Sequence, residues 1–232
     1  MLEATIKKQL RDFTLDLSFS VKQGEILILM GANGSGKSTT LNLIAGLLHP
    51  DSGCIRLGDV TLCEPPADTN VPVEDRWIGY VFQNSAVFPH MTVAENVAFG
   101  LRARNLPRTE IADRVSQMID LMQLADLRDV KAGNLSGGQK QRVALGRAIA
   151  IQPSLLMLDE PFTSLDAEST HAVRELTRTV VTKFKIPCLI VSHHIADSRE
   201  IGDRVLMLRS GKAVWEGSPQ NIPDDEAVCR CR

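Results

Sequence analysis

Short apolar runs alternate along this chain with longer segments whose apolar residues recur at helical spacing. The runs at 25–30, 155–158 and 188–191 predict strands buried on both faces of a parallel sheet. Three other segments place their apolar residues on one face of a helix. These residues are Leu41, Ile44, Ala45 and Leu48; Ile111, Val115, Met118, Ile119 and Met122; and Val143, Ala144, Leu145, Ala148 and Ile149. The alternation predicts an α/β fold.

The stretch between residues 88 and 150 has a mainly helical pattern. Thr92 and Glu95 stand three residues apart, as in a capping box that starts a helix. We therefore expect a helical subdomain over about 88–150 within a single domain that spans 1–232. Met118 and Met122 are interpreted as core residues rather than as a ligand surface.

Composition is that of an ordinary globular chain. The 232 residues are 44% hydrophobic and 23% charged, and the longest apolar stretches are far shorter than the roughly 20 residues that cross a bilayer. The start at Met1 does not resemble a signal peptide. A net charge of −2 and the lack of a basic run argue against nucleic acid as a partner.

Five cysteines are scattered without a disulfide or zinc pattern, which favours reduced thiols. Cys229 and Cys231 form a C-x-C near the end of the chain. Such a pair could bind a soft metal, but no further ligand pattern accompanies it, so a frayed tail is favoured.

A phosphate-binding loop is the strongest chemical signal. Residues 31–38 fit the pattern G-x-x-x-x-G-K-[ST], with a predicted strand before them and a predicted helix after them, as the pattern requires. The glycines let successive N–H groups and the helix N-terminus converge on phosphate. Lys37 is expected to bridge the β- and γ-phosphates and Ser38 to ligate magnesium. The predicted nucleotide contacts are Gly31, Asn33, Gly34, Ser35, Gly36, Lys37, Ser38 and Thr39.

Two adjacent carboxylates close the predicted strand at 155–158. Ligands bind at the carboxyl ends of strands in open α/β sheets, so Asp159 is expected to hold magnesium and Glu160 to act as general base on the attacking water. Pro161 supports an end of the strand at this point. A solvated acidic turn is the alternative when the motif is taken alone.

A second phosphate-binding device lies between these two motifs. Ser136 and Gln139 have capping-box spacing, and Gly137 and Gly138 allow close approach to the N-terminus of the helix that follows. One nucleotide does not need both devices from one chain. Two chains packed head to tail, each closing the other's phosphate loop, are the simplest explanation.

On these residues the chain resembles the nucleotide-binding subunits of ATP-binding-cassette (ABC) transporters, whose signature is matched by residues 135–139. The resemblance implies a P-loop NTPase core with a mostly parallel sheet, N-terminal antiparallel strands and an inserted helical subdomain. It makes Gln83 a ligand of magnesium and the attacking water, His193 the γ-phosphate contact, and 164–166 a loop at the dimer interface. His194 departs from the family, where Asp is common, and is expected to enter the next helix.

The family usually stacks an aromatic residue on adenine, upstream of the phosphate loop. Phe13 is the aromatic residue available there, and a place in a strand core suits it equally well. Leu10 or Arg11 could pack on the base instead. Selectivity for ATP is therefore implied by the family resemblance alone.

The segment 87–101 resembles importer subunits for sugars, polyamines, sulfate and molybdate, in which a groove beside the glutamine loop receives a coupling helix of the permease. Phe88 and Met91 are candidate anchors there, with a buried hydrophobic turn as the alternative. The turn at 10–13 is most similar to molybdate or tungstate importers. The length is expected to leave no room for a C-terminal regulatory domain.

The resemblance thus implies an ATP-hydrolysing importer subunit with ATP and Mg²⁺ as its cofactors. Its implied partners are a second copy of the chain, transmembrane permease subunits and, indirectly, a solute-binding protein. Its implied place is peripheral, at the cytoplasmic face of the inner membrane. The alternatives are a soluble ABC ATPase that acts on nucleic acid or the ribosome, and an exporter ATPase subunit.

Overall fold

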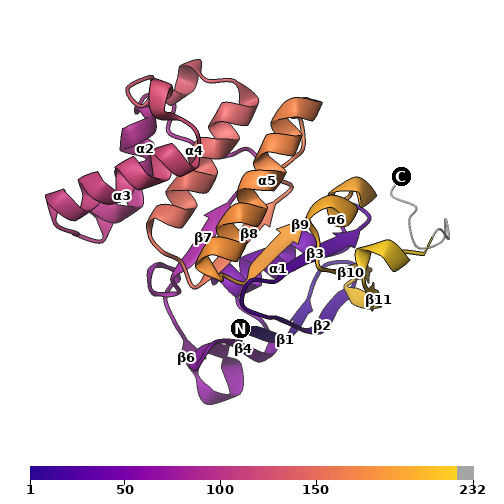
Figure 1. Ribbon diagram of the computed structural model, residues 1–232. Coiled ribbons are helices and arrows are strands. Elements are labelled where there is room, and N and C mark those ends of the chain that lie inside the picture. Colours follow the sequence, from indigo (N-terminus) through magenta and orange to yellow (C-terminus); the bar gives the residue numbers. More distant parts are fainter. Residues whose placement is uncertain (224–232) are drawn as a thin grey trace.

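One mixed sheet of 11 strands runs through residues 1–223, the part of the chain that the computed structural model describes. Its order is β6-β5-β4-β1-β2-β11-β10-β3-β9-β8-β7, and the ribbon in Figure 1 labels most of these strands. Cys229 and Cys231 lie outside the described residues. Among residues 1–223, no helix combines the length and the apolar character that a bilayer crossing needs.

The parallel part of the sheet carries the three predicted apolar runs. Strands β10 (Arg204–Arg209), β3 (Ile26–Gly31), β9 (Cys188–Val191), β8 (Leu155–Asp159) and β7 (Ile78–Val81) pair in parallel in this order. Their carboxyl ends therefore meet along one edge, where the sequence predicted the chemistry to lie.

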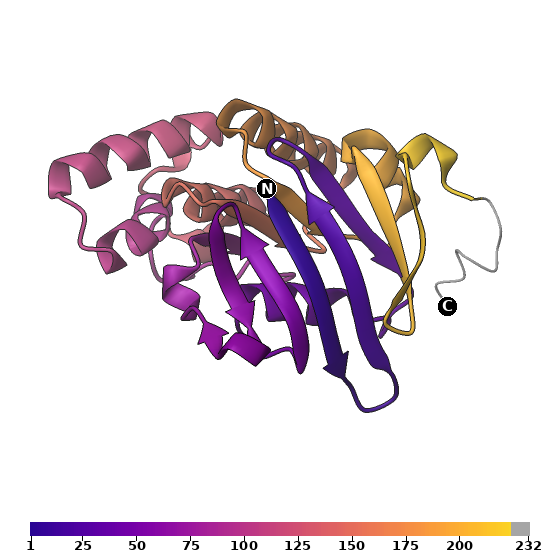
Figure 2. The ribbon, with the colours of Figure 1, turned by 90° about the horizontal axis from the view of Figure 1, so that it is seen from below.

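The antiparallel part begins the chain, as the fold prediction required. It consists of β1 (Leu2–Gln9), β2 (Thr14–Val21), β4 (Ser52–Leu57), β5 (Val60–Glu64) and β6 (Thr69–Asn70). These strands pair antiparallel in the order β2-β1-β4-β5-β6. The hairpin of β10 and β11 (Lys212–Gly217) joins them to the parallel strands. Figure 2 shows these long strands in front of the helices.

Strand alternation splits the core into two layers. On β3, Ile28 and Met30 pack into the cluster beneath the helical region, whereas Leu27 and Leu29 pack into the cluster that contains α1 (Lys37–Ala45). All four are at most 3% exposed, so both faces of this strand are covered. This explains why the parallel strands are apolar at every position instead of at alternate ones.

The predicted helical region folds as α2 (Val93–Ala103), α3 (Arg108–Leu121) and α4 (Gly137–Ala150), which pack on one another at one end of the sheet (Figure 1). The predicted capping box is present: Glu95 N–H donates to Thr92 Oγ1 at 3.1 Å, and Thr92 N–H donates to Glu95 Oε2 at 2.8 Å. Met118 and Met122 are buried core residues, as predicted.

Two further helices, α5 (Ala167–Phe184) and α6 (Ile195–Ile201), follow β8 and β9. One detail of the sequence pattern is wrong. Leu48 was expected on the helix that begins near residue 37, but α1 ends at Ala45 because Gly46 adopts a left-handed φ of 83°. Leu48 lies beyond this C-cap and is 40% exposed.

Candidate active site

The phosphate loop joins β3 to α1 and is shaped by its glycines. Gly31 has a φ of 149°, and a Cβ there would lie 2.3 Å from the carbonyl oxygen of Leu208. Gly36 caps α1 with a φ of 106° and without a side-chain hydrogen bond. The N-terminus of α1 is therefore not covered by a cap of its own, which suits it to bind an anion.

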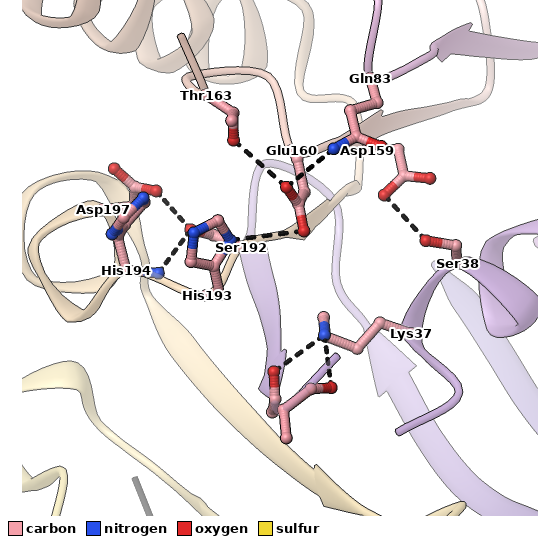
Figure 3. Close-up of polar contacts among 12 residues, drawn as sticks. Lys37, Ser38, Gln83, Asp159, Glu160, Thr163, Ser192, His193, His194 and Asp197 are labelled. Carbon is pink, nitrogen blue, oxygen red and sulfur yellow. Dashed lines mark hydrogen bonds and ion pairs between the residues drawn. The ribbon is translucent and has the colours of Figure 1, made fainter. Parts of the chain in front are cut away.

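Lys37 folds back over the loop. Its ammonium donates hydrogen bonds to the carbonyl oxygens of Gly31 at 2.8 Å and Ala32 at 2.9 Å (Figure 3). The side chain is largely buried, yet it lines a cavity of about 400 Å³. The cavity collects predicted site residues from distant parts of the sequence: Asn33, Gly34, Gly36, Lys37, Ser38, Thr39, Gln83, Glu160 and His193.

Two oxygen-bearing side chains meet where the sequence predicted a magnesium site. Ser38 Oγ donates to Asp159 Oδ1 at 3.2 Å, which joins the start of α1 to the end of β8. Burial raises the pKa of the Asp159 carboxyl, and the hydrogen bond from Ser38 opposes that shift. Hydroxyl, carboxylate and amide oxygens are hard ligands that suit Mg²⁺, which keeps waters and substrate phosphates as its other ligands. The residues present therefore fit this ion.

Glu160 occupies a strained position directly after β8. Its φ is 47°, in the left-handed region that non-glycine residues seldom adopt, and its N–H donates to the Val191 carbonyl of β9 at 3.0 Å. Asp159, by contrast, is the last residue of β8 and accepts the Ser38 hydroxyl. The two adjacent acids thus face different groups, as their different predicted roles require.

Three strand ends meet at the Glu160 carboxylate (Figure 3). Gln83, which follows β7, donates its amide to Oε2 at 3.1 Å, and His193, which follows β9, places Nδ1 3.3 Å from Oε1. Thr163 also donates to Oε2, at 3.3 Å. The structure brings the first two together with Glu160, as the sequence analysis expected. Thr163 was missed, since only its position three residues after Glu160 indicated such a contact.

Phe13 lies against the phosphate loop. A Cβ on Gly36 would lie 3.7 Å from its Cε2 atom, and a Cβ on Gly211 would lie 2.6 Å from its Cδ2 atom. The ring is only partly buried, so it is not the strand-core residue that was the alternative. Its place beside the start of α1 leaves part of an aromatic surface next to the cavity.

The signature turn has the predicted local structure but lies elsewhere. Ser136 caps α4, its Oγ accepting the Gln139 N–H at 3.3 Å while Gln139 Oε1 accepts the Ser136 N–H at 2.9 Å. Ser136 and Gly137 are exposed, whereas a Cβ on Gly138 would lie 2.5 Å from Ser169 Oγ. No residue of 136–139 is among those lining the 400 Å³ cavity.

An apolar groove of about 450 Å³ lies between the end of β7 and α2. Exposed aromatic rings line it, with Phe82 43% and Phe99 42% exposed. Phe88 also lines the groove and contacts Phe99 with ring centroids 4.4 Å apart, whereas Met91 is not among the lining residues. Phe82 lines the groove and the next residue, Gln83, lines the 400 Å³ cavity, so adjacent residues of one segment contribute to both.

Comparison with known families and structures agrees with this geometry. Residues 14–163 match the family model described as ABC transporter. A nucleotide-free ATP-binding cassette from an ABC transporter superposes with a TM-score of 0.86 at 26% identity, covering 99% of this chain and 97% of that chain. A dimeric ATP-binding cassette in a post-hydrolysis state, bound to ADP and Pi, gives a TM-score of 0.78 at 27% identity, covering 94% and 99%.

Curated relatives match over most of this chain. They include the trehalose/maltose import ATP-binding protein MalK of Thermococcus litoralis, 41% identical over 91% of this chain and 57% of its own length. The sulfate/thiosulfate import ATP-binding protein CysA of Synechococcus elongatus is 41% identical, over 96% and 64%. The molybdenum import ATP-binding protein ModC of Mycobacterium tuberculosis is 40% identical, over 91% and 58%. The chain thus spans about three fifths of the length of these relatives.

Proposed function

We propose that this chain is an ATPase subunit of an importer. The chain belongs to the ABC transporter family. The observation that carries the proposal is the meeting of Gln83, Glu160 and His193 beside the phosphate loop. A base, an amide and an imidazole from three strand ends, next to a lysine and a helix N-terminus, suit the transfer of a γ-phosphoryl group to water.

In the proposed reaction the phosphate loop binds the triphosphate of ATP. Lys37 exchanges the loop carbonyls for the β- and γ-phosphates, and the N–H groups at the start of α1 surround the same oxygens. Glu160 accepts the proton of the attacking water, which Gln83 helps to orient, and His193 donates a hydrogen bond to the γ-phosphate.

Ser38, Asp159 and Gln83 would hold Mg²⁺. The ion supplies positive charge that neutralises the phosphate oxygens as negative charge moves during the transfer. Burial raises the pKa of Asp159, and a bound cation would oppose that shift because it favours the charged carboxylate.

Two copies would complete the site. The exposed Ser136 and Gly137 at the N-terminus of α4 present a second anion-binding end that the cavity of its own chain does not use. We propose a head-to-tail dimer in which this end closes the phosphate loop of the other copy. The likeness to a dimeric cassette bound to ADP and Pi supports the arrangement.

The apolar groove would receive a permease. Exposed rings of Phe82 and Phe99 make it a suitable surface for the apolar face of a helix, and its contact with the segment of Gln83 gives nucleotide state a route to the partner. A location at the cytoplasmic face of the inner membrane follows from this partnership, as does an indirect partnership with a solute-binding protein.

The substrate is proposed to be an oxyanion of the molybdate or tungstate type. The named relatives import sugars, sulfate and molybdenum at nearly the same identity, so overall similarity does not separate these classes. The proposal rests on the compact turn at 10–13, which joins β1 to β2 and places Phe13 beside the phosphate loop.

A paired experiment tests the proposal. Phosphate release by the purified chain with Mg-ATP tests the enzyme, and a mild-detergent pull-down from its own cells, followed by mass spectrometry, tests the partner. We expect hydrolysis and a multi-span permease. Hydrolysis together with only ribosomal or nucleic-acid partners would favour a soluble ABC ATPase over an importer subunit. No phosphate release by the purified chain would refute the proposed ATPase activity.

A further inference from the structure

We propose that Ser192, Asp197 and Arg174 form a largely buried chain of hydrogen bonds and ion pairs that positions His193 for the γ-phosphate. The inference rests on the proposed function, because it concerns a residue that acts only through His193. None of the three side chains lines the cavity of the active site. They are therefore positioning residues and not catalytic ones.

The first link fixes the backbone on both sides of His193, which lies in the turn from β9 to α6. Ser192 N–H donates to the Leu29 carbonyl oxygen of β3 at 3.2 Å. Ser192 Oγ accepts the His194 N–H at 3.1 Å. The hydroxyl thus closes a short turn whose middle residue is His193, and the direction of the imidazole depends on that turn.

The second link fixes the hydroxyl itself. Ser192 Oγ donates to the Asp197 carboxylate in the first turn of α6, so its hydrogen and one lone pair are both used. Ser192 and Asp197 are each 2% exposed, which leaves no room for exchange with bulk water. Figure 3 shows this pair on the side of His193 away from the phosphate loop, with the imidazole between it and Glu160.

The third link carries the chain to α5. Arg174 forms ion pairs with Asp197 and with Glu200, and its guanidinium carbon lies 5.4 Å from the ring centroid of Phe162. Phe162 is buried two residues after Glu160. One guanidinium therefore lies between the turn that carries His193 and the loop that carries Glu160. Removing Arg174 would leave the charge of the buried Asp197 without this partner, whereas without Asp197 the guanidinium would keep Glu200.

A second ion pair on α5 allows the effect of these hydrogen bonds on His193 to be separated from the docking of α5 on α6. Arg178, one turn further along α5, binds the Asp203 carboxylate at 2.9 and 3.0 Å and also donates to the Ile201 carbonyl. That pair already ties α5 to the end of α6. It has no hydrogen bond to Ser192 or to the turn of His193, so it offers a matched control.

The kinetic test compares three variants of the full chain. Ser192→Ala removes the hydroxyl and leaves the ion pair of Arg174 and Asp197 in place, so we expect kcat with Mg-ATP to fall about ten- to hundredfold while nucleotide affinity is kept. Ser192→Thr restores the hydroxyl and is expected to recover most of kcat. Arg178→Gln is expected to lower Tm but to keep kcat.

A second readout does not depend on turnover. The imidazole nitrogen NMR signals of the nucleotide-free protein, assigned with His193→Gln, are expected to shift for His193 in Ser192→Ala and to stay in place in Arg178→Gln. An unchanged signal together with an unchanged kcat in Ser192→Ala would overturn the inference. Equal losses of kcat in Ser192→Ala and Arg178→Gln would also overturn it, because general destabilisation would then suffice.

The failure of the proposed function looks different. A wild-type chain without ATPase activity would refute that function, and the NMR comparison would still decide whether the Ser192 hydroxyl holds His193.

Discussion

Two helix N-termini with neighbouring glycines behave in opposite ways in this molecule. The start of α1 has no side-chain cap and opens into a cavity that also contains Glu160 and His193. The start of α4 is capped by the box of Ser136 and Gln139 and lies exposed, outside that cavity. The same device, a helix dipole with close backbone approach, is thus complete in one place and outward-facing in the other.

This difference is what the proposed head-to-tail dimer explains. The side of α1 brings Lys37, the Ser38 hydroxyl and the Glu160 carboxylate to one cavity within a single chain. The side of α4 supplies only N–H groups and glycines to whatever approaches it. Chemistry in this protein is therefore expected to respond to local changes at α1, whereas changes at α4 should act only when two chains meet.

The largest effect is expected from Glu160→Gln, which tests whether the side of α1 holds the base. The variant keeps the shape and can still accept from Gln83 and Thr163, but it cannot take a proton from water. We expect kcat to fall about 10²- to 10⁴-fold with ATP binding retained, measured as phosphate release. Light scattering should then show a dimer that depends on ATP.

Glu175→Gln, on an exposed carboxylate of α5, is the matched control and should turn over normally. Full activity of Glu160→Gln would mean that another group is the base.

Gly137→Asp tests the outward-facing side. A Cβ on Gly137 meets only Leu165 Cδ2, at 3.4 Å, so the fold should accept the change. The added negative charge would face the γ-phosphate bound to the partner copy, so we expect turnover to fall at least about hundredfold while one chain still binds nucleotide. Turnover and equilibrium binding measured on the same sample check this.

Gly137→Ala adds the Cβ without the charge and should keep most of the activity. Normal hydrolysis by Gly137→Asp would argue against the head-to-tail dimer.

Phe13→Ala tests whether the start of α1 also provides the contact to the adenine base. The ring lies beside Gly36, where it could stack on adenine, and stacking on an aromatic ring is worth about 1–3 kcal/mol per base. We expect the ATP dissociation constant to rise about tenfold, measured by titration calorimetry, with kcat little changed at saturation. Phe13→Trp should keep the affinity. Equal ATP affinity of the wild type, Phe13→Ala and Phe13→Trp would mean that Leu10 or Arg11 packs on adenine instead.

The smallest of the expected effects is a change in Tm caused by Asp159→Asn, and the direction of that change is the test. Burial raises the pKa of Asp159 in the folded chain, so the folded state holds the proton more tightly than the unfolded state. Stability therefore falls as the pH rises from the ordinary aspartate pKa through the raised one, and at neutral pH the charge is a cost.

The neutral variant should accordingly raise Tm of the nucleotide-free protein by about 2 °C at neutral pH. It should also lose the further stabilisation that Mg-ATP gives the wild type. Differential scanning calorimetry at pH 7 measures both quantities, and a lower Tm for Asp159→Asn without nucleotide would contradict the account. Asp120→Asn, on an exposed position of α3, is the control.

Features that depend on near neighbours could be predicted from local patterns of residues. Hydrophobic periodicity placed β3, β8 and β9, because a strand covered on both faces must be apolar at every position. Spacing of three residues identified both capping boxes, because Thr92 with Glu95 and Ser136 with Gln139 bond within one helical turn. The phosphate loop was also local, since its glycines serve the backbone of eight consecutive residues.

Contacts between distant segments could be found only in the folded structure. It placed Phe13 beside Gly36, which is 23 residues further along the chain. It also buried Arg76 to 2% exposure at the end of α1, where the guanidinium donates to the Ile44 carbonyl at 2.7 Å.

The chain of Ser192, Asp197 and Arg174 belongs to the same group. A serine, an aspartate and an arginine are common at exposed positions, and their spacing matches no local motif. They meet because α5 and α6 pack on one another, which brings residues of separate elements within hydrogen-bond distance. Sequence patterns record bonds within one turn or one strand, whereas contacts across elements exist only once the sheet has set its order.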